Sequence, residues 1–233
     1  MLGPLDYSIW LVGFLLEVSV IFCIAYRKVF HRYFSISTYM LCAAAVGCGQ
    51  YMSILKFGIN STEYWYFYYY TGSLLTIVMF FVIIQLYQHV FAELNVHRYI
   101  RGGASILLFA TALFSYFVVR HNSDRLTNEF VVELGQNLYF VGVVLTYLLW
   151  AAVLQLRETR TRLIQLVLAL GIYFSGNAGT YALRNLFPGL QPAFLQWLPP
   201  LFGALLPLAW AYTFFKVPEE ARLMTARLAV TTR

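Results

Sequence analysis

The stretch Glu63–Phe91 limits the folds open to this chain more than any other part of the sequence. Every residue from Tyr64 to Tyr70 is aromatic, and no charged side chain follows before His89. About 20 apolar residues in a helix cross a hydrocarbon core ~30 Å thick, and aromatic side chains gather at the lipid–water interface. The stretch therefore predicts a transmembrane helix whose first turns lie at a membrane surface.

The same pattern recurs along the chain and predicts a membrane protein. Hydrophobic residues make up 61% of the 233 residues and charged residues 11%, whereas soluble domains carry about 25% charged residues. Seven apolar runs are long enough to span a bilayer, the fourth being the shortest. They lie at about Tyr7–Tyr26, Tyr33–Leu55, Tyr64–Phe91, Ala104–Val119, Phe130–Leu156, Leu163–Leu183 and Leu195–Phe215.

The predicted fold is an all-α bundle of seven transmembrane helices. Only helices and closed barrels satisfy their backbone hydrogen bonds in lipid, and these runs lack the alternation of a barrel strand. The short connections make neighbouring helices antiparallel. We expect residues 1–217 to form a seven-helix transmembrane domain and residues 218–233 to form a short basic cytoplasmic tail.

The distribution of lysine and arginine predicts the orientation of the bundle. Twelve of the 16 basic residues fall in the first, third and fifth connections and the tail, whereas Lys56, Arg120, Arg125 and Arg184 fall on the other side. Cytoplasmic connections are enriched in basic residues, so the C-terminus is expected in the cytoplasm and the N-terminus outside. We expect a multi-pass protein of the cell membrane, or of the inner membrane if the source is bacterial.

Single cysteines in the connections test this orientation. Because the positive-inside rule places the second and fourth connections outside, Ser61→Cys and Ser123→Cys should react with a membrane-impermeant thiol reagent on intact cells. Thr159→Cys should react only after the membrane is opened. The parent protein, whose three cysteines lie in apolar runs, gives the background. The reverse labelling pattern would overturn the orientation.

Polar and aromatic side chains form one-sided stripes in the outer halves of three predicted helices. The stripes are Tyr66, Tyr69, Tyr70 and Ser73; Glu133, Gln136 and Asn137; and Tyr173, Asn177, Thr180, Tyr181 and Arg184. Steps of three or four residues share one face of a helix, so the stripes can converge into an outward-facing cup.

The cup predicts a ligand site. Tyrosine supplies an apolar wall with a polar tip, and a buried amide orients a headgroup or a carbonyl. We expect an ion pair between Glu133 and Arg184 to close the rim. The predicted ligand-binding residues are Tyr69, Ser73, Asn177, Tyr181, Glu133 and Arg184. The alternative is that these groups only bond helix to helix and form an interfacial aromatic belt, with no ligand.

Two other groups of ionisable residues are candidates for function. Glu17 lies at mid-depth, where ionisable groups are costly; it is either a protonated or hydrogen-bonded structural carboxyl, or a relay for protons or cations. His89, Glu93 and His97 follow one another at steps of four and would share a face if the third helix continued. That face has transition-metal ligand chemistry. The alternative, a solvated polar run, is the one we expect, without a metal.

Missing residue types limit the chemistry further. Lys28, Lys56 and Lys216 all lie at the ends of predicted helices, so the last helix offers no lysine for a retinal Schiff base, and we expect no cofactor. The sequence contains no phosphate loop, no zinc-protease signature and no serine–histidine–aspartate set.

These observations favour a non-enzymatic membrane protein. We expect a subunit of a larger membrane assembly, or a receptor-like module with a small or lipid-like ligand in the outward-facing cup. Its partners would be the lipid bilayer and other membrane subunits or copies of itself, and not nucleic acid. The alternative is a transporter or channel with a path past Glu17 and Asn177. A pore from the cup to His89 would favour transport, and a cup closed below by Phe and Leu would favour the module.

Overall fold

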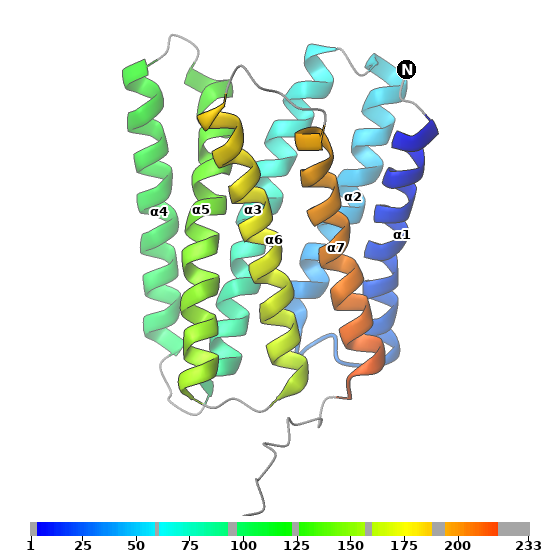
Figure 1. Ribbon diagram of the computed structural model, residues 1–233, viewed down its shortest axis with the longest axis vertical. Coiled ribbons are helices and arrows are strands. Elements are labelled where there is room, and N and C mark those ends of the chain that lie inside the picture. The colour runs from blue at the N-terminus through cyan, green and yellow to red at the C-terminus, as the bar shows by residue number, and fades with distance from the viewer. Residues whose placement is uncertain are drawn as a thin grey trace, which may run out of the picture.

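Seven helices make up the described part of the chain. The computed structural model describes residues 4–58, 61–92, 97–122, 126–156, 160–187 and 194–218. No strand occurs in these ranges. The predicted tail lies outside them except for Pro218. The helices are α1 (Pro4–Tyr26), α2 (Phe34–Phe57), α3 (Thr62–Val90), α4 (His97–Asn122), α5 (Leu126–Gln155), α6 (Thr161–Leu186) and α7 (Phe194–Lys216) (Figure 1).

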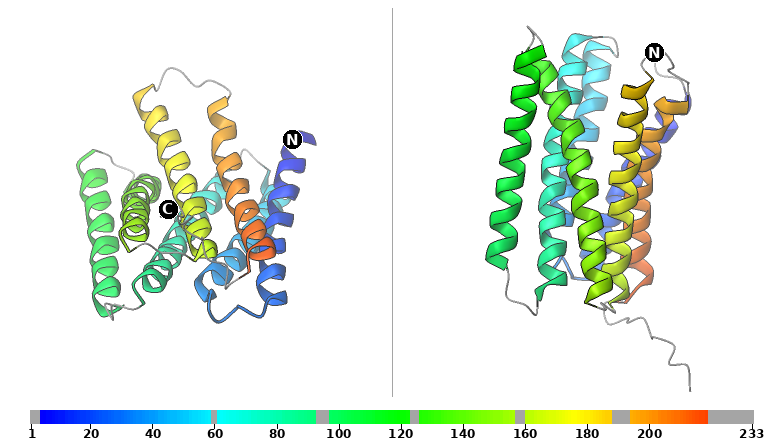
Figure 2. Two further views of the ribbon diagram at one scale, coloured as in Figure 1. Left: turned by 60° about the horizontal axis from the view of Figure 1, so that its bottom comes forward. Right: turned by 60° about the vertical axis from the view of Figure 1, so that its left-hand side comes forward.

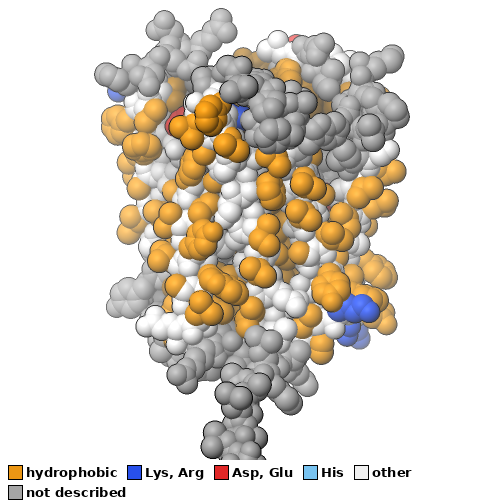
Figure 3. All heavy atoms as spheres, in the orientation of Figure 1, with side chains coloured by type: hydrophobic (Ala, Val, Ile, Leu, Met, Phe, Trp, Pro, Cys, Tyr) orange, Lys and Arg blue, Asp and Glu red, His pale blue; other side chains and the backbone are white. Residues whose placement is uncertain are grey.

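The lateral surface of the bundle is apolar. The helices α2 to α7 each contain a segment long and apolar enough to cross a membrane, and the described side chains of α1 cover a shorter apolar segment, Trp10–Tyr26. Large hydrophobic side chains such as Phe22, Ile106 and Phe117 are exposed. Hydrophobic side chains cover the face seen in Figure 3 between its two ends. The predicted all-α membrane bundle is therefore confirmed.

Six helices form a ring, and the seventh packs outside it. The order of contacts around the ring is α1, α2, α3, α5, α6 and α7, which closes against α1. The outer helix, α4, packs mainly against α5 and has few contacts with α3 (Figures 1 and 2). We call the end that holds the start of α1 the upper end, and the end that holds the last residues of α7 the lower end. The connections with most of the basic residues join helices at the lower end (Figure 1).

Bulky aromatic side chains fill the bundle from its middle to its lower end. Phe80, Phe174, Trp210 and Phe214 are each 0% exposed. The rings of Phe80 in α3 and Phe174 in α6 meet edge to face, with centroids 6.2 Å apart. Gly142 of α5 makes room for this pair, because a Cβ atom there would collide with the Phe174 ring. Lipid supplies no hydrophobic drive between helices, so such close packing is what holds them together.

A buried arginine joins the start of α6 to the end of α7. Arg162 is 2% exposed, and its Nε and Nη2 atoms donate to the backbone oxygen of Val217 at 3.1 and 2.6 Å. Its guanidinium group also lies over the ring of Phe214, 5.6 Å from the ring centroid. The sequence pattern places Arg162 in a connection, but α6 already begins at Thr161 and the side chain turns into the bundle.

Two side chains of α3 close the lower end against the start of α2. Gln85 donates from Nε2 to the backbone oxygen of Arg32 at 2.9 Å, and its Oε1 accepts from the backbone nitrogen of Ser35 at 3.0 Å. The ring of His89 stacks on Tyr33, with centroids 5.6 Å apart and 6° between the planes. The lower end is therefore held by hydrogen bonds as well as by packed rings.

Replacing Arg162 tests how much this end depends on it. We expect Arg162→Gln to lower the free energy of unfolding by about 3 kcal/mol, because removing it leaves a buried carbonyl without its donors. Arg162→Lys should also be destabilising, since a point charge cannot reproduce the planar fork of donors. Thermal melts in detergent measure both effects. Arg120→Gln, at an exposed arginine of α4, is the control and should change little. Equal melting temperatures for Arg162→Gln and the parent would contradict this role.

Candidate functional site

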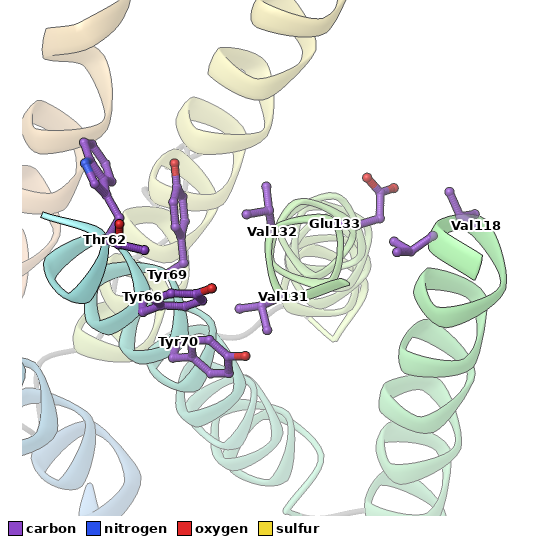
Figure 4. Close-up of a pocket in the computed structure, with 10 residues that line it drawn as sticks. Thr62, Tyr66, Tyr69, Tyr70, Val118, Val131, Val132 and Glu133 are labelled. Atoms are coloured by element: carbon purple, nitrogen blue, oxygen red, sulfur yellow. The ribbon is translucent and has the colours of Figure 1, made fainter. Parts of the chain in front are cut away.

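A pocket of about 440 Å³ lies at the upper end, among α3, α4 and α5. Its walls combine aromatic side chains of α3 with valines of α4 and α5 and one carboxylate. The described lining residues are Thr62, Trp65, Tyr66, Tyr69, Tyr70, Val118, Val119, Val131, Val132 and Glu133 (Figure 4). The pocket lies beside α4, which packs mainly against α5 and has few contacts with α3.

The aromatic wall follows from where α3 begins. Ser61 caps the helix, and its Oγ accepts from the backbone nitrogen of Tyr64 at 3.1 Å, so the helix starts directly before the aromatic run. Residues four apart then pair: Trp65 stacks on Tyr69 with ring centroids 5.7 Å apart, and the rings of Tyr66 and Tyr70 are tilted, with centroids 6.4 Å apart. These four side chains are 41–44% exposed. Their ring faces are therefore accessible from the pocket and its mouth.

Polar side chains hold the three helices in register around the pocket. Ser73 of α3 donates to the backbone oxygen of Val131 in α5 at 2.9 Å. Asn137 of α5 donates from Nδ2 to Ser115 Oγ of α4 at 3.0 Å and to Glu133 Oε1 at 3.1 Å. The carboxylate of Glu133 is thus fixed on the side of α5 next to α4. Such interhelical bonds contribute about 0.6 kcal/mol each in membranes, enough to orient a helix.

A second group of polar residues lies inside the ring of helices. We call it the interior tyrosine cluster: Tyr39 of α2, Tyr139 of α5, and Tyr173 and Tyr181 of α6. The hydroxyls of Tyr139 and Tyr173 are 3.3 Å apart, and the Tyr39 side chain is a further hydrogen-bond partner of Tyr173. The rings of Tyr139 and Tyr181 lie 5.6 Å apart. Phenols from three helices therefore meet inside the ring, near the middle of the bundle.

Tyr68 faces this cluster and was missed by the sequence analysis. It is close enough to Tyr139, Tyr181 and Arg184 to interact electrostatically with each of them, yet it is 41% exposed. The signal was present in the sequence. Steps of four lead back from Thr76, which is 3% exposed, through Gly72 to Tyr68, so Tyr68 lies on the inward face of α3. Because all seven residues from Tyr64 to Tyr70 are aromatic, the sequence pattern did not indicate which of them faces inward.

The predicted cup residues are divided between these two regions. Tyr69 and Glu133 line the pocket. Tyr181 belongs to the interior cluster, and Arg184 is exposed beside Tyr68 and Tyr181. Asn177 is 5% exposed and donates to the backbone oxygen of Tyr173 within its own helix.

Ser73 is bonded to α5 below the pocket. The partner seen for Glu133 is Asn137, and its pairing with Arg184 stays a prediction. Glu17 of α1 interacts electrostatically with Tyr39 of the interior cluster. Tyr39, Tyr173 and Tyr139 therefore meet inside the ring of helices, and Phe174 and Trp210, both 0% exposed, pack against Tyr173 and Tyr39 at the same level.

His89 and His97 do not lie on one continuous helix. The third helix ends at Val90, and His97 opens α4. The condition that α3 continues through all three residues is therefore not met. The Nδ1 atom of His89 is bonded to the backbone oxygen of Gln85 at 2.8 Å. Glu93 and the side chain of His97 lie outside the described residues. Within the described part of the chain, no three His, Cys, Asp or Glu side chains are grouped as a metal site.

The fold and the pocket define the class: a multi-pass helical membrane protein with an aromatic pocket at one end. Comparison of the chain with models of protein families, with curated proteins and with solved structures finds no match. The function is therefore argued from the site alone.

Glycine substitutions test the difference between an open upper interior and a packed centre. A Cβ atom at Gly72 meets open space, whereas one at Gly142 collides with Phe174. We expect Gly72→Ala to keep or raise the melting temperature, because alanine favours the helix by up to about 1 kcal/mol. The matched change Gly142→Ala should cost about 1–3 kcal/mol through overpacking. Equal melts for the two variants would show that the packing around them does not differ in this way.

Proposed function

We propose that this chain is a non-enzymatic membrane protein, a receptor-like module or a subunit of a larger assembly, that binds a small or lipid-like ligand. The ligand site is the pocket among α3, α4 and α5. The observation that carries the proposal is the pocket itself: about 440 Å³, walled by aromatic and valine side chains, with one carboxylate. Ligand sites are concave and mostly apolar, with a few polar groups that fix orientation.

The packing supports a binding role in which the ligand changes the position of a helix at the side of the bundle. The lower half is filled by buried rings, and the described contacts of α4 are mainly with α5. A ligand between α3 and α4 would therefore act first on the position of α4, which has the fewest neighbours. A partner subunit or a second copy of the chain beside α4 would sense that shift. Orientation and membrane follow the sequence-based expectation, with the pocket on the outer side.

Transport is the second candidate, favoured by one observation. Glu17 acts electrostatically on Tyr39 of the interior tyrosine cluster, and hydroxyls of that cluster meet inside the ring of helices. Phe174 and Trp210 are fully buried beside the cluster, so a path would require these rings to move.

A pocket-filling variant tests the proposal. We expect a molecule to copurify with the parent protein in mild detergent and to be detected by native mass spectrometry. Val132→Trp, which fills the pocket from α5, should reduce its occupancy at least fivefold, while the melting temperature stays within a few degrees. Val144→Trp is the matched control, because Val144 lies on the same helix and is 58% exposed on the lateral surface.

Two outcomes would contradict the proposal. One is that the parent protein binds nothing, and the other is that both tryptophan variants retain the molecule equally. Solute flux into proteoliposomes that is abolished by Glu17→Gln and unaffected by Val132→Trp would favour transport instead.

A further inference from the structure

The aromatic wall of the pocket offers more than apolar surface. Trp65, Tyr66, Tyr69 and Tyr70 come from two successive turns of α3 and form two pairs, with Trp65 stacked on Tyr69 and Tyr66 tilted against Tyr70. All four remain more than two-fifths exposed, so neighbouring side chains do not seal their faces. Ring faces carry negative electrostatic potential and attract cations within about 6 Å of the centroid.

The charge in the pocket has the same sign as the ring faces. Glu133 is the one charged side chain among the described lining residues. Asn137 occupies one of its oxygens, and a carboxylate has further acceptor sites. Arg184, near the upper end of α6, acts on Tyr68 and Tyr181, which do not line the pocket. The described walls therefore favour a cation and disfavour an anion.

The remaining walls select the kind of cation. Val118, Val119, Val131 and Val132 offer no hydrogen-bond acceptor from their side chains. A primary ammonium is strongly hydrated and would lose that hydration here. A quaternary ammonium carries its charge beneath methyl groups, which suit valine and ring faces alike. Figure 4 shows Tyr66 and Tyr70 projecting from α3 towards α5, and Glu133 projecting from α5 on the side of α4, so ring faces and carboxylate come from different helices.

On these grounds, and resting on the proposed function, we propose that the pocket among α3, α4 and α5 binds a quaternary ammonium group. The aromatic wall of α3 receives its methyl groups, and Glu133 provides the counter-charge. The group belongs either to a choline-type lipid headgroup or to a free small cation. The aromatic run lies at the depth of lipid headgroups, where Trp and Tyr gather, so both sources reach the pocket.

The lipid source is tested by competition for the full chain. The protein is exchanged into nanodiscs that contain equal amounts of phosphatidylcholine, phosphatidylethanolamine and phosphatidylglycerol with the same acyl chains, and retained lipid is counted by native mass spectrometry. We expect phosphatidylcholine to be enriched roughly fivefold over the other two, as cation–π contacts of moderate strength imply. Glu133→Gln and Tyr69→Leu should each bring the three lipids close to parity.

Matched controls separate this effect from loss of folding. Glu63→Gln removes a carboxylate from the first turn of α3, outside the pocket. Tyr212→Leu removes an exposed tyrosine from α7, far from the lining residues. Both should keep the enrichment. Glu133→Gln retains an acceptor for Asn137, so its melting temperature should stay near that of the parent.

The free-cation source has its own measurement. Tetramethylammonium chloride should raise the melting temperature of the detergent-solubilised parent above that in sodium chloride of equal ionic strength, because a ligand that binds only the folded state stabilises it. The rise should disappear in Glu133→Gln. A rise in melting temperature without enrichment of phosphatidylcholine assigns the site to a small cation. Enrichment of phosphatidylcholine without that rise assigns it to a lipid headgroup.

The remaining outcomes overturn the inference and distinguish it from the proposed function. A molecule that occupies the pocket and is lost in Val132→Trp, but shows neither preference, would contradict the quaternary ammonium and leave the binding function standing. Enrichment that survives in Glu133→Gln and Tyr69→Leu would place the choline lipid elsewhere on the protein. No bound molecule in any condition would contradict both.

Discussion

The structure depends on one constraint: lipid offers neither hydrogen-bond partners nor a hydrophobic drive between helices. Side chains of one helix therefore bond the backbone of another at several levels. Ser73 reaches Val131, and the hydroxyl of Tyr87 donates to the backbone oxygen of Leu145 at 2.7 Å, both joining α3 to α5. Arg162 completes this pattern at the lower end by donating to a carbonyl beyond α7. Polar residues that look like functional candidates in the sequence thus serve partly as hydrogen-bond links between helices.

The same constraint makes the centre of the bundle closely packed. Phe80 and Phe174 are fully buried and meet edge to face, and the rings of Tyr139 and Tyr173 pack against Phe174. Nearer the upper end, a Cβ atom at Gly72 would meet open space. Binding needs space and movable walls, and the pocket among α3, α4 and α5 provides both at the upper end.

The packing of α4 determines how ligand binding in the proposed pocket would change the shape of the bundle. This helix contacts mainly α5, and Asn137 provides a polar bond to it through Ser115. The same Asn137 holds the carboxylate of Glu133. A ligand that draws Glu133 would therefore pull on the residue that fixes α4. The proposed ligand and the position of α4 would thus be linked through one side chain, Asn137.

The sequence by itself determined the class, the helices and their alternation across the membrane. Long apolar runs such as Glu63–Phe91 exclude water-exposed folds whatever their neighbours are, and helix periodicity placed Tyr69 and Glu133 at the same end. Only the tertiary structure decided which faces meet. Tyr68 and Tyr69 are adjacent in sequence, yet one turns to the interior and the other lines the pocket. Periodicity reports the angle between side chains on one helix, but not the rotation of that helix against the others. Rotation is set by packing, such as that of Phe174 against Gly142.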